Sequence, residues 1–140
     1  MPTDYNIKTV VKYGPLEVVD AIGLANAGKD KWWNQTLTRV NDCVVRLGVF
    51  EGRFHFHKHD REDEYFQVME GELLLDIADP PVAHKPGELP EVPRDTRHKT
   101  VRLNPGQGFT VPRGVVHRTR APVRTVVLMI EAKGVVPTGD

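Results

Sequence analysis

The chain of 140 residues has the length of one domain, and its 19 basic and 19 acidic residues cancel to a formal net charge of zero. A domain of this size buries roughly two-thirds of the surface that its unfolded chain exposes, so it can form a true core. The balanced charge gives no electrostatic basis for binding nucleic acid or an anionic membrane, and no apolar run approaches the roughly 18 residues of a membrane span. The expected partners are small molecules and further copies of the chain.

The first residues and the single cysteine bear on location. Met1 to Asn6 have neither the basic start nor the apolar stretch of a secretory signal peptide, so we expect a cytoplasmic protein. Cys43 is the only cysteine and cannot form an internal disulfide, which fits a reducing compartment. Because Val44 and Val45 follow it, Cys43 is predicted to be a buried small side chain.

The first third of the chain is mixed. Residues Ile7 to Tyr13 predict a short strand that stops at Gly14 and Pro15. The apolar spacing from Leu16 to Leu24, with Asp20 available as a cap, predicts one short helix or turn. The adjacent indoles of Trp32 and Trp33 are expected to pack across a barrel end or in a subunit contact, in preference to forming a ligand platform.

Short strands divided by turn residues dominate from Gln35 onward. A hairpin turn is predicted at Asn41 and Asp42, and a second at Glu70 and Gly71, because these residues tolerate the backbone of tight turns. Gly52 is expected to mark a bulge. The strands predicted around these turns are 36–40, 43–50, 53–59, 64–69 and 72–77.

Residues 79–98 interrupt this pattern with prolines and charges, which predicts a long surface loop, either a lid over a site or a disordered connection. His84 and His98 in this loop are expected to be solvated. Strands resume at 99–103 and 109–112. Val123 to Ala132 predicts a strong final strand that is buried on both faces from Val126 to Ile130.

A candidate metal site lies between two of these strands. On a strand, His57 and His59 would project to the same side about 7 Å apart, a spacing that one ion can bridge. Glu64 could return from the next strand as a third ligand, after the polar turn that follows His59.

The motifs around these residues carry a family resemblance. His57-x-His59, four residues, Glu64, six residues and Gly71 are followed by Gly106, five residues, Pro112-x-Gly114, two residues and His117. Residues 52–71 and 106–121 thereby resemble, in order, both signature motifs of the cupin superfamily. Gly52 lies one residue closer to the first histidine than is usual, and Ala121 stands where an asparagine often closes the second motif. The end of the chain is similar to that of small single-domain bacterial cupins of the mannose-6-phosphate isomerase-like group.

The resemblance implies an all-β fold, a double-stranded β-helix or jelly-roll barrel formed by one domain over residues 1–140. It also implies that His57, His59, Glu64 and His117 bind one divalent metal ion, with Glu64 as the candidate catalytic residue. Three imidazoles and a carboxylate suit Fe, Mn, Ni, Zn, Co or Cu and leave two positions open if the ion is six-coordinate. By strand alternation His55 shares their face, as a residue supporting the ligands, an alternate ligand or a side chain packed toward the rim.

Three functions fit such a site. The first is a metal-dependent oxygenase-type enzyme that acts on a small organic molecule, and the alternatives are a metal-dependent sugar or carbonyl isomerase and a non-catalytic binding protein. A phosphorylated substrate would need an inward basic cluster, for which Arg46, Arg53, Arg118 and Arg120 are the candidates, although arginines more often lie on the outside of a barrel. The family resemblance also leads us to expect a homodimer. Inward positions by parity are Phe66, Val68, Phe109, Val111, Val115 and Thr119.

Overall fold

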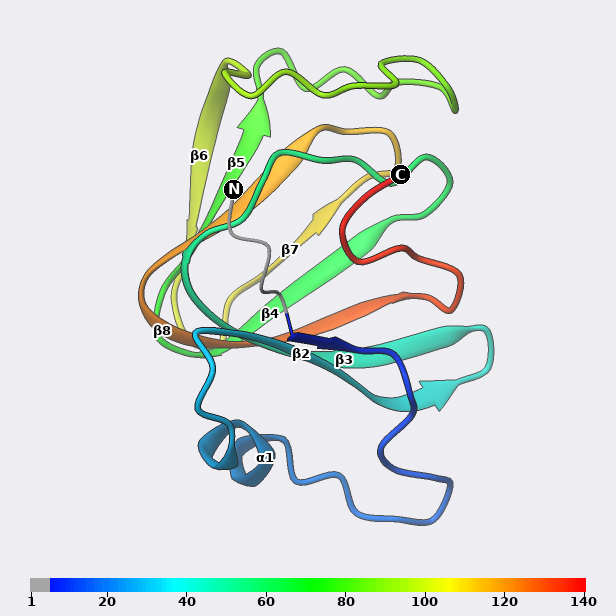
Figure 1. Cartoon of the computed structure of the whole chain (residues 1–140), viewed down its shortest axis with the longest axis vertical. Coiled ribbons are helices and arrows are strands. Elements are labelled where there is room, and N and C mark those ends of the chain that lie inside the picture. Colours follow the sequence, from blue (N-terminus) through cyan, green and yellow to red (C-terminus); the bar gives the residue numbers. More distant parts are fainter. Residues whose placement is uncertain (1–5) are drawn as a thin grey trace.

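The computed structural model describes residues 6–140, so the prediction drawn from Met1 to Asn6 lies outside the described residues except for Asn6. Within this range the chain forms a jelly-roll of β-strands with one short helix on its outside (Figure 1). This confirms the predicted all-β fold. The elements in chain order are β1 (Asn6–Lys8), α1 (Ala21–Ala27), β2 (Trp32–Val40), β3 (Cys43–Arg53), β4 (Glu64–Glu70), β5 (Leu73–Ala78), β6 (His98–Leu103), β7 (Gly108–Val111) and β8 (His117–Ala132).

The sheet is organised around β8. Along one edge β8 pairs antiparallel with β3, and along the other it pairs first with β5, through its residues 117–120, and then with β4, through residues 126–131. β2 and β1 continue the sheet beyond β3, while β7 pairs with β4 and β6 with β5. β8 therefore belongs to both halves of the barrel.

The first predicted hairpin is confirmed and the second is wrong. β2 and β3 pair across Asn41, whose φ of 52° is the left-handed conformation expected there. β4 and β5 do not pair with each other, because the turn at Gly71 carries the chain from one part of β8 to another. Gly71 has a φ of +87°, and a Cβ there would lie 2.4 Å from Oγ1 of Thr125. Glycine is thus required for a crossover turn rather than for a hairpin.

The predicted strand over Arg53–His59 is also wrong, because β3 ends at Arg53 and the chain is irregular from there to Glu64 apart from one bridge at His57. The bulge at Gly52 is confirmed by the register shift between Phe50 and Gly52 in the β3–β8 pairing.

Two hydrophobic cores lie on the two faces of β8. Val127 and Met129 point into the barrel, among side chains that include Phe50, Phe66 and Leu75. Val126 points to the other face, where Trp33, Leu37, Leu47 and Ala25 of α1 form a second cluster. The tryptophan pair is split between them, since Trp32 packs half-buried against the barrel core.

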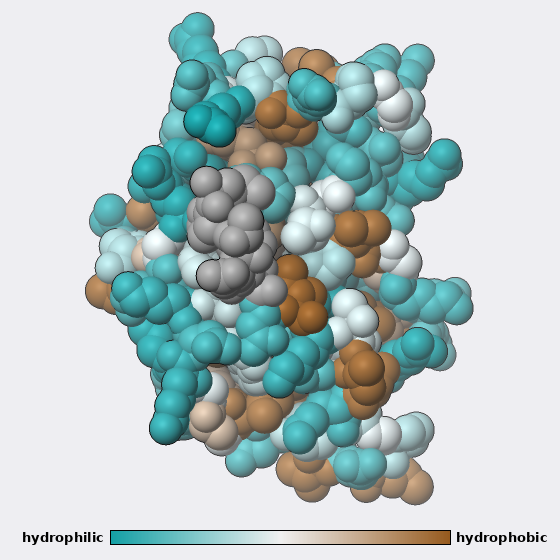
Figure 2. Space-filling view, in the orientation of Figure 1, coloured by the Kyte–Doolittle hydropathy of each residue, from teal (hydrophilic) through white to brown (hydrophobic). Residues whose placement is uncertain are grey.

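The short helix and the long surface loop lie where the sequence predicts them. Asp20 caps α1, and its carboxylate accepts a hydrogen bond from the amide of Gly23. The connection between β5 and β6, which spans residues 79–97, is irregular as predicted except for a short bridge between Ala83 and Val115. No helix among the described residues is long and apolar enough to cross a membrane. On the face shown in Figure 2, apart from the grey residues, hydrophobic residues form separate small patches among hydrophilic ones.

Two predicted burials are wrong. Cys43 is exposed, because it begins β3 at the outer end of the hairpin while Val44 takes the buried position. Ile130 is 44% exposed, because the face of β8 opposite the barrel is covered by α1 only near Val126.

A charge cluster around the buried Asp76 joins β5, β6 and β8 on the face that points away from the barrel interior. Asp76 is fully buried and accepts hydrogen bonds from Arg118 at 2.6 Å, Arg120 at 2.6 and 2.9 Å, and Thr100 at 2.7 Å. Nε2 of His98 lies 3.6 Å from the same carboxylate, so His98 is half-buried beside Asp76 and is not the solvated residue expected. His84 is likewise half-buried, 3.7 Å from Glu88.

Replacing Asp76 with Asn should destabilise the fold by about 3 kcal/mol, because it leaves two arginines without their carboxylate. Burial alone would raise the pKa of Asp76, but the hydrogen bonds from Arg120, Thr100 and Arg118 outweigh it and lower that pKa to about 2. The stabilisation is therefore complete above the ordinary pKa of 3.8 and is lost as the pH falls toward 2. Urea unfolding at several pH values measures both effects. Asp42→Asn, at a 94% exposed side chain, is the control and should leave stability unchanged.

Candidate metal centre

Two of the candidate ligands face each other across a bridge of backbone hydrogen bonds. The amide of His57 donates to the carbonyl of His117 at 2.9 Å, and the amide of His117 donates to the carbonyl of His57 at 2.9 Å. This pair continues the β3–β8 pairing past the end of β3, since the amide of Phe54 also donates to Thr119. The two motifs thus meet through main-chain bonds, and the ring centroids of these histidines lie 4.4 Å apart.

The other two candidate ligands come from the loop and from β4. The amide of Gly114, in the second motif, donates to the carbonyl of His59 at 2.8 Å and holds that residue against the turn before β8. Glu64 is the first residue of β4 and points into the barrel. The structure therefore brings together all four residues predicted from the motifs.

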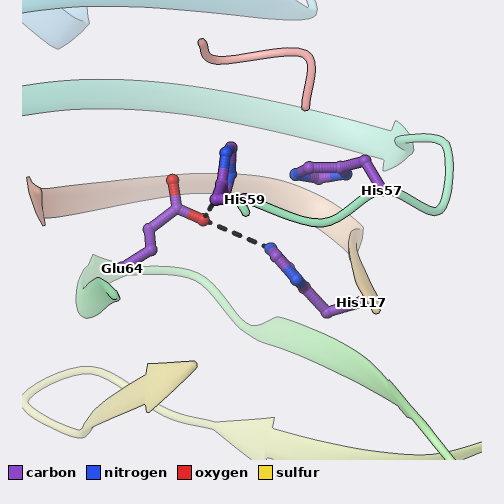
Figure 3. A group of neighbouring side chains, drawn as sticks. All are labelled: His57, His59, Glu64 and His117. Atoms are coloured by element: carbon purple, nitrogen blue, oxygen red, sulfur yellow. Dashed lines mark hydrogen bonds and ion pairs between the residues drawn. The ribbon is translucent and has the colours of Figure 1, made fainter. Parts of the chain in front are cut away.

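The four side chains converge on one point (Figure 3). Each offers one ligand atom, all of these atoms lie within 4.8 Å of one another, and all four residues are buried. Oε1 of Glu64 lies 3.3 Å from Nε2 of His117 and 3.5 Å from Nε2 of His59. Since metal–nitrogen distances are about 2.0–2.1 Å, donors on opposite sides of one ion lie about 4 Å apart, so small side-chain adjustments would suffice.

The hydrogen bonds outside the cluster set the imidazole tautomers. Nδ1 of His57 lies 2.9 Å from the carbonyl of His55, and Nδ1 of His117 lies 2.9 Å from the carbonyl of Val115. A carbonyl can only accept, so each Nδ1 carries the proton and each Nε2 keeps a lone pair. Burial, followed by the neighbouring His117 and His59, holds the pKa of His57 well below its usual range and favours the neutral ring.

His59 supplies the observation that tests whether a metal ion fits. Both of its ring nitrogens are buried, and neither has a hydrogen-bond partner among the described residues. A buried polar group without a partner costs about 1–3 kcal/mol. An ion at the convergence point would give Nε2 its missing partner, so the residues present fit a divalent metal.

A fifth charged residue, Glu131, lies beside the cluster and was not predicted from the sequence. Glu131 of β8 pairs in register with Glu64 of β4, so the two carboxyl groups lie side by side in the barrel. Burial would raise the pKa of Glu64, but a hydrogen bond from Glu131 and the nearby imidazoles of His117 and His59 hold that pKa well below its usual range. Burial, together with the adjacent Glu64, raises the pKa of Glu131 to about 10, so Glu131 holds the proton and Glu64 the charge.

Arg46 completes this interior network. Its Nε lies 3.4 Å from Glu131 and donates to Oδ1 of Asn34 at 2.9 Å. Of the four arginines considered for an inward role, Arg46 is the buried one that faces the barrel, whereas Arg118 and Arg120 bind Asp76 on the opposite face. Strand parity carried a signal for both residues, because Arg46 shares the face of Phe50 on β3 and Glu131 shares the face of Met129 on β8.

The C-terminal segment lies against the first motif, as Figure 1 shows. The amide of Asp140 donates to the carbonyl of Lys58 at 2.9 Å, and the carboxylate of Asp140 accepts from the amide of Asp60 at 2.6 Å. Nε2 of His55 lies 2.6 Å from the carbonyl of Thr138. His55 is thus outside the converging group and contacts this segment, which supports the segment that carries His57 and His59.

A cavity opens beside the cluster. Its floor includes His57 and Glu64, and its walls include Phe66 and Thr119, two of the six predicted inward residues. Of the remaining four, Val68, Val111 and Val115 lie in the barrel core, and Phe109 packs half-buried against it. The cavity is also lined by Asn6, Ile7, Trp32, Trp33, Asn34, Phe50, Phe54, Met129, Glu131 and Pro137.

Comparison with known proteins identifies the family. The family model described as a cupin domain matches residues 43–101. The uncharacterized protein YdbB of Bacillus subtilis (strain 168) is 38% identical over 112 residues, which are 80% of this chain and 83% of that protein. The chain belongs to the cupin superfamily. The matched range ends before His117, so the second half of the site rests on the structure.

Solved cupin structures share this fold. A cupin-2 domain containing protein from Shewanella frigidimarina NCIMB 400 superposes with a TM-score of 0.64 at 25% identity, over 82% of this cupin and 94% of that chain. Hydroquinone 1,2-dioxygenase PnpCD in complex with Fe3+ superposes with a TM-score of 0.65 at 15% identity, over 84% of this chain and 33% of that one. Its complex with Cd2+ and 4-hydroxybenzonitrile gives 0.63 at 21% identity, over 100% and 92%. The mannose-6-phosphate isomerase-like group stays a prediction.

Removing one ligand should weaken metal binding strongly. We expect His57→Ala to lower the affinity for Zn2+ by about 100-fold or more, because one of four donors is lost, while His84→Ala leaves it unchanged. Affinity in the unsubstituted protein should also fall on acidification, since imidazole must be neutral to bind, and for His57 this loss is expected only well below the ordinary imidazole pKa of about 6.5. Competition with a chromophoric chelator measures both. An equal loss in the two variants would show that the ligand assignment is wrong.

The contact between the C-terminal segment and His57 can be tested at Gly139. A Cβ there would lie 2.5 Å from Cβ of His57, and the φ of +97° disfavours any other residue. Gly139→Ala should therefore displace the segment and speed the transfer of Zn2+ to a chelator by about tenfold, the effect usual for groups that support ligands. Gly87→Ala is a matched control, with a φ of +82° and open space around it. Identical transfer rates in the two variants would contradict the role given to this segment.

Proposed function

We propose that this cupin is a metal-dependent oxygenase-type enzyme that acts on a small organic molecule, with His57, His59, Glu64 and His117 as the metal ligands. The observation that carries the proposal is the one-sided arrangement of the site. Four donors converge on one point, and the cavity beside it is walled largely by hydrophobic side chains. Such a wall leaves room for a substrate at the metal and excludes bulk water.

A bound divalent ion of this kind would supply open coordination positions and Lewis acidity. The chain supplies the rest. Glu64 offers the negative charge that balances part of the ion's charge, and His57 and His117 are held in the required tautomer by their carbonyl partners. Glu131 keeps a proton next to Glu64, at the edge of the cavity where a substrate oxygen would lie. That proton is the one that this site could lend to a reacting group.

The lining of the cavity favours oxygenation over the isomerisation of a phosphorylated sugar. Among the described residues that line it there is no lysine or arginine. Arg46 lies nearby but is engaged by Glu131 and Asn34. The dioxygenase PnpCD shares the fold, which supports the view that a barrel of this shape can hold such chemistry.

Oxygen consumption tests the proposal. The purified chain, reconstituted in turn with Fe2+, Mn2+, Ni2+, Zn2+, Co2+ and Cu2+, should consume oxygen with at least one member of a panel of small aromatic, diketone and sugar substrates. A redox-active ion is expected to support turnover and Zn2+ is not. His117→Ala should abolish turnover, and His84→Ala should retain it. Metal and ligand binding without turnover for any ion would instead identify a non-catalytic binding protein.

Two expectations stay predictions for this cupin. A homodimer is supported by the position of β1, a strand of three residues at the edge of the sheet, which a second copy could extend. The native mass in solution decides it. The cytoplasmic location rests on the sequence alone.

A further inference from the structure

Thr119 brings an unused hydroxyl group to the cavity beside the metal centre. It lies two residues after His117 on β8, so both side chains point to the barrel interior. Thr119 is 5% exposed and lines the cavity, and its hydroxyl makes no hydrogen bond to a described residue. A buried hydroxyl without a partner has lost its hydration and gained nothing in return. A ligand in the cavity can supply the missing partner.

Asn34 brings a second unused group, and Arg46 fixes which way its amide points. Nε of Arg46 donates to Oδ1 of Asn34 at 2.9 Å, and Nη2 of Arg46 donates to the same oxygen. Guanidinium nitrogens can only donate, so the atom that faces Arg46 is the oxygen and the NH2 group points away from it. Asn34 lines the cavity, and its NH2 group has no hydrogen-bond partner among the described residues. It is therefore a donor available to a ligand.

Both groups are placed by the elements that place the metal ligands. Thr119 shares β8 with one of them. Arg46, which holds Asn34, also lies 3.4 Å from Glu131, and Glu131 pairs in register with the ligand Glu64. A ligand at the open side of the ion therefore meets a fixed N–H donor and a fixed hydroxyl.

The size and charge of the cavity limit the ligand further. It encloses about 40 Å³, which is room for about three waters, so a molecule of about three to four carbon atoms fits it. The described residues that line it include no lysine or arginine. A negative group on the ligand, away from the ion, would therefore be buried without a partner.

We propose that Asn34 and Thr119 select a small, uncharged, aliphatic hydroxyketone. Its carbonyl oxygen accepts a hydrogen bond from the NH2 group of Asn34, and its hydroxyl group pairs with that of Thr119, which can both donate and accept. A molecule without these oxygens leaves both protein groups unpaired, and polar sites reject such molecules most strongly. The inference rests on the proposed function and names the substrate class for the same site.

The test measures binding and does not require turnover. The full chain loaded with Zn2+ is titrated with hydroxyacetone and with 2-butanone, in which a methyl group replaces the hydroxyl, and ligand-observed NMR gives both dissociation constants. Hydroxyacetone is expected to bind about threefold to tenfold more tightly, the range that one neutral hydrogen bond supplies.

Two variants assign the two contacts. Thr119→Val keeps the shape of the side chain and should abolish the preference for hydroxyacetone while leaving the affinity for 2-butanone unchanged. Asn34→Asp keeps an oxygen for Arg46 and loses the NH2 group, so it should weaken both ketones by about threefold to tenfold. Thr110→Val and Asn104→Asp, at exposed positions that do not line the cavity, are the matched controls and should change neither affinity.

Elemental analysis verifies that each variant retains the metal. A preference for hydroxyacetone that survives Thr119→Val would place both ligand oxygens on the ion and overturn the inference. Equal affinities for the two ketones in the unsubstituted chain, or unchanged affinities in metal-loaded Asn34→Asp, would overturn it as well. The comparison at Thr119 stands by itself if Asn34→Asp does not fold.

The two proposals fail in different ways. Oxygen consumption on another substrate class, without selective binding of hydroxyacetone, would remove the hydroxyketone and keep the oxygenase. Selective binding that depends on Thr119 and Asn34, without oxygen consumption for any ion, would keep the ligand class and remove the oxygenase.

Discussion

The pairing of β8 along both of its edges is the constraint on which the rest of the structure depends. β3 follows one edge, and β5 and then β4 follow the other. Because side chains on a strand alternate, the same face of β8 presents His117, Thr119, Met129 and Glu131 to the barrel interior. Pairing with β3 brings in His57, and pairing with β4 brings in Glu64, so two motifs far apart in the chain meet at one point.

The interior of the barrel holds more charge than a core usually tolerates. Glu64, Glu131 and Arg46 are all nearly inaccessible to water, and two of them are acids that face each other in register. Like charges at this spacing cannot both ionise, so one proton remains on Glu131 and Arg46 balances the pair. The buried nitrogens of His59 remain without a partner among the described residues. An interior of this kind is stabilised by a bound cation, which links the stability of the barrel to metal binding.

Local patterns predicted much of this fold but only part of the pairing between its strands. The hairpin at Asn41, the bulge at Gly52 and the irregular segment 79–97 follow from turn and proline chemistry that acts within a few residues. The turn at Gly71 looks the same in sequence, but its partners are set by Thr125 and by the two edges of β8, which no local pattern contains. The convergence of His57, His59, Glu64 and His117 was predictable because their motifs place them in register. Glu131 was not predicted, and Arg46 was only one of four arginines considered, because charged residues on strands usually face outward and only the completed barrel shows that these two face in.

The two ends of the cavity are built differently, and this difference bears on how a ligand is chosen. The metal end stands on paired strands and on the bridge between His57 and His117, so its donors are held by main-chain bonds. The cavity lining also includes Ile7, from a strand of three residues, and Pro137, from a segment without regular structure. Rigid placement of donors favours a defined geometry at the metal, whereas lightly held lining residues can adjust to the size of the molecule that enters. Selection by chemistry therefore belongs to the converging donors and the carboxyl pair, and the lightly held residues affect only the size of molecule that fits.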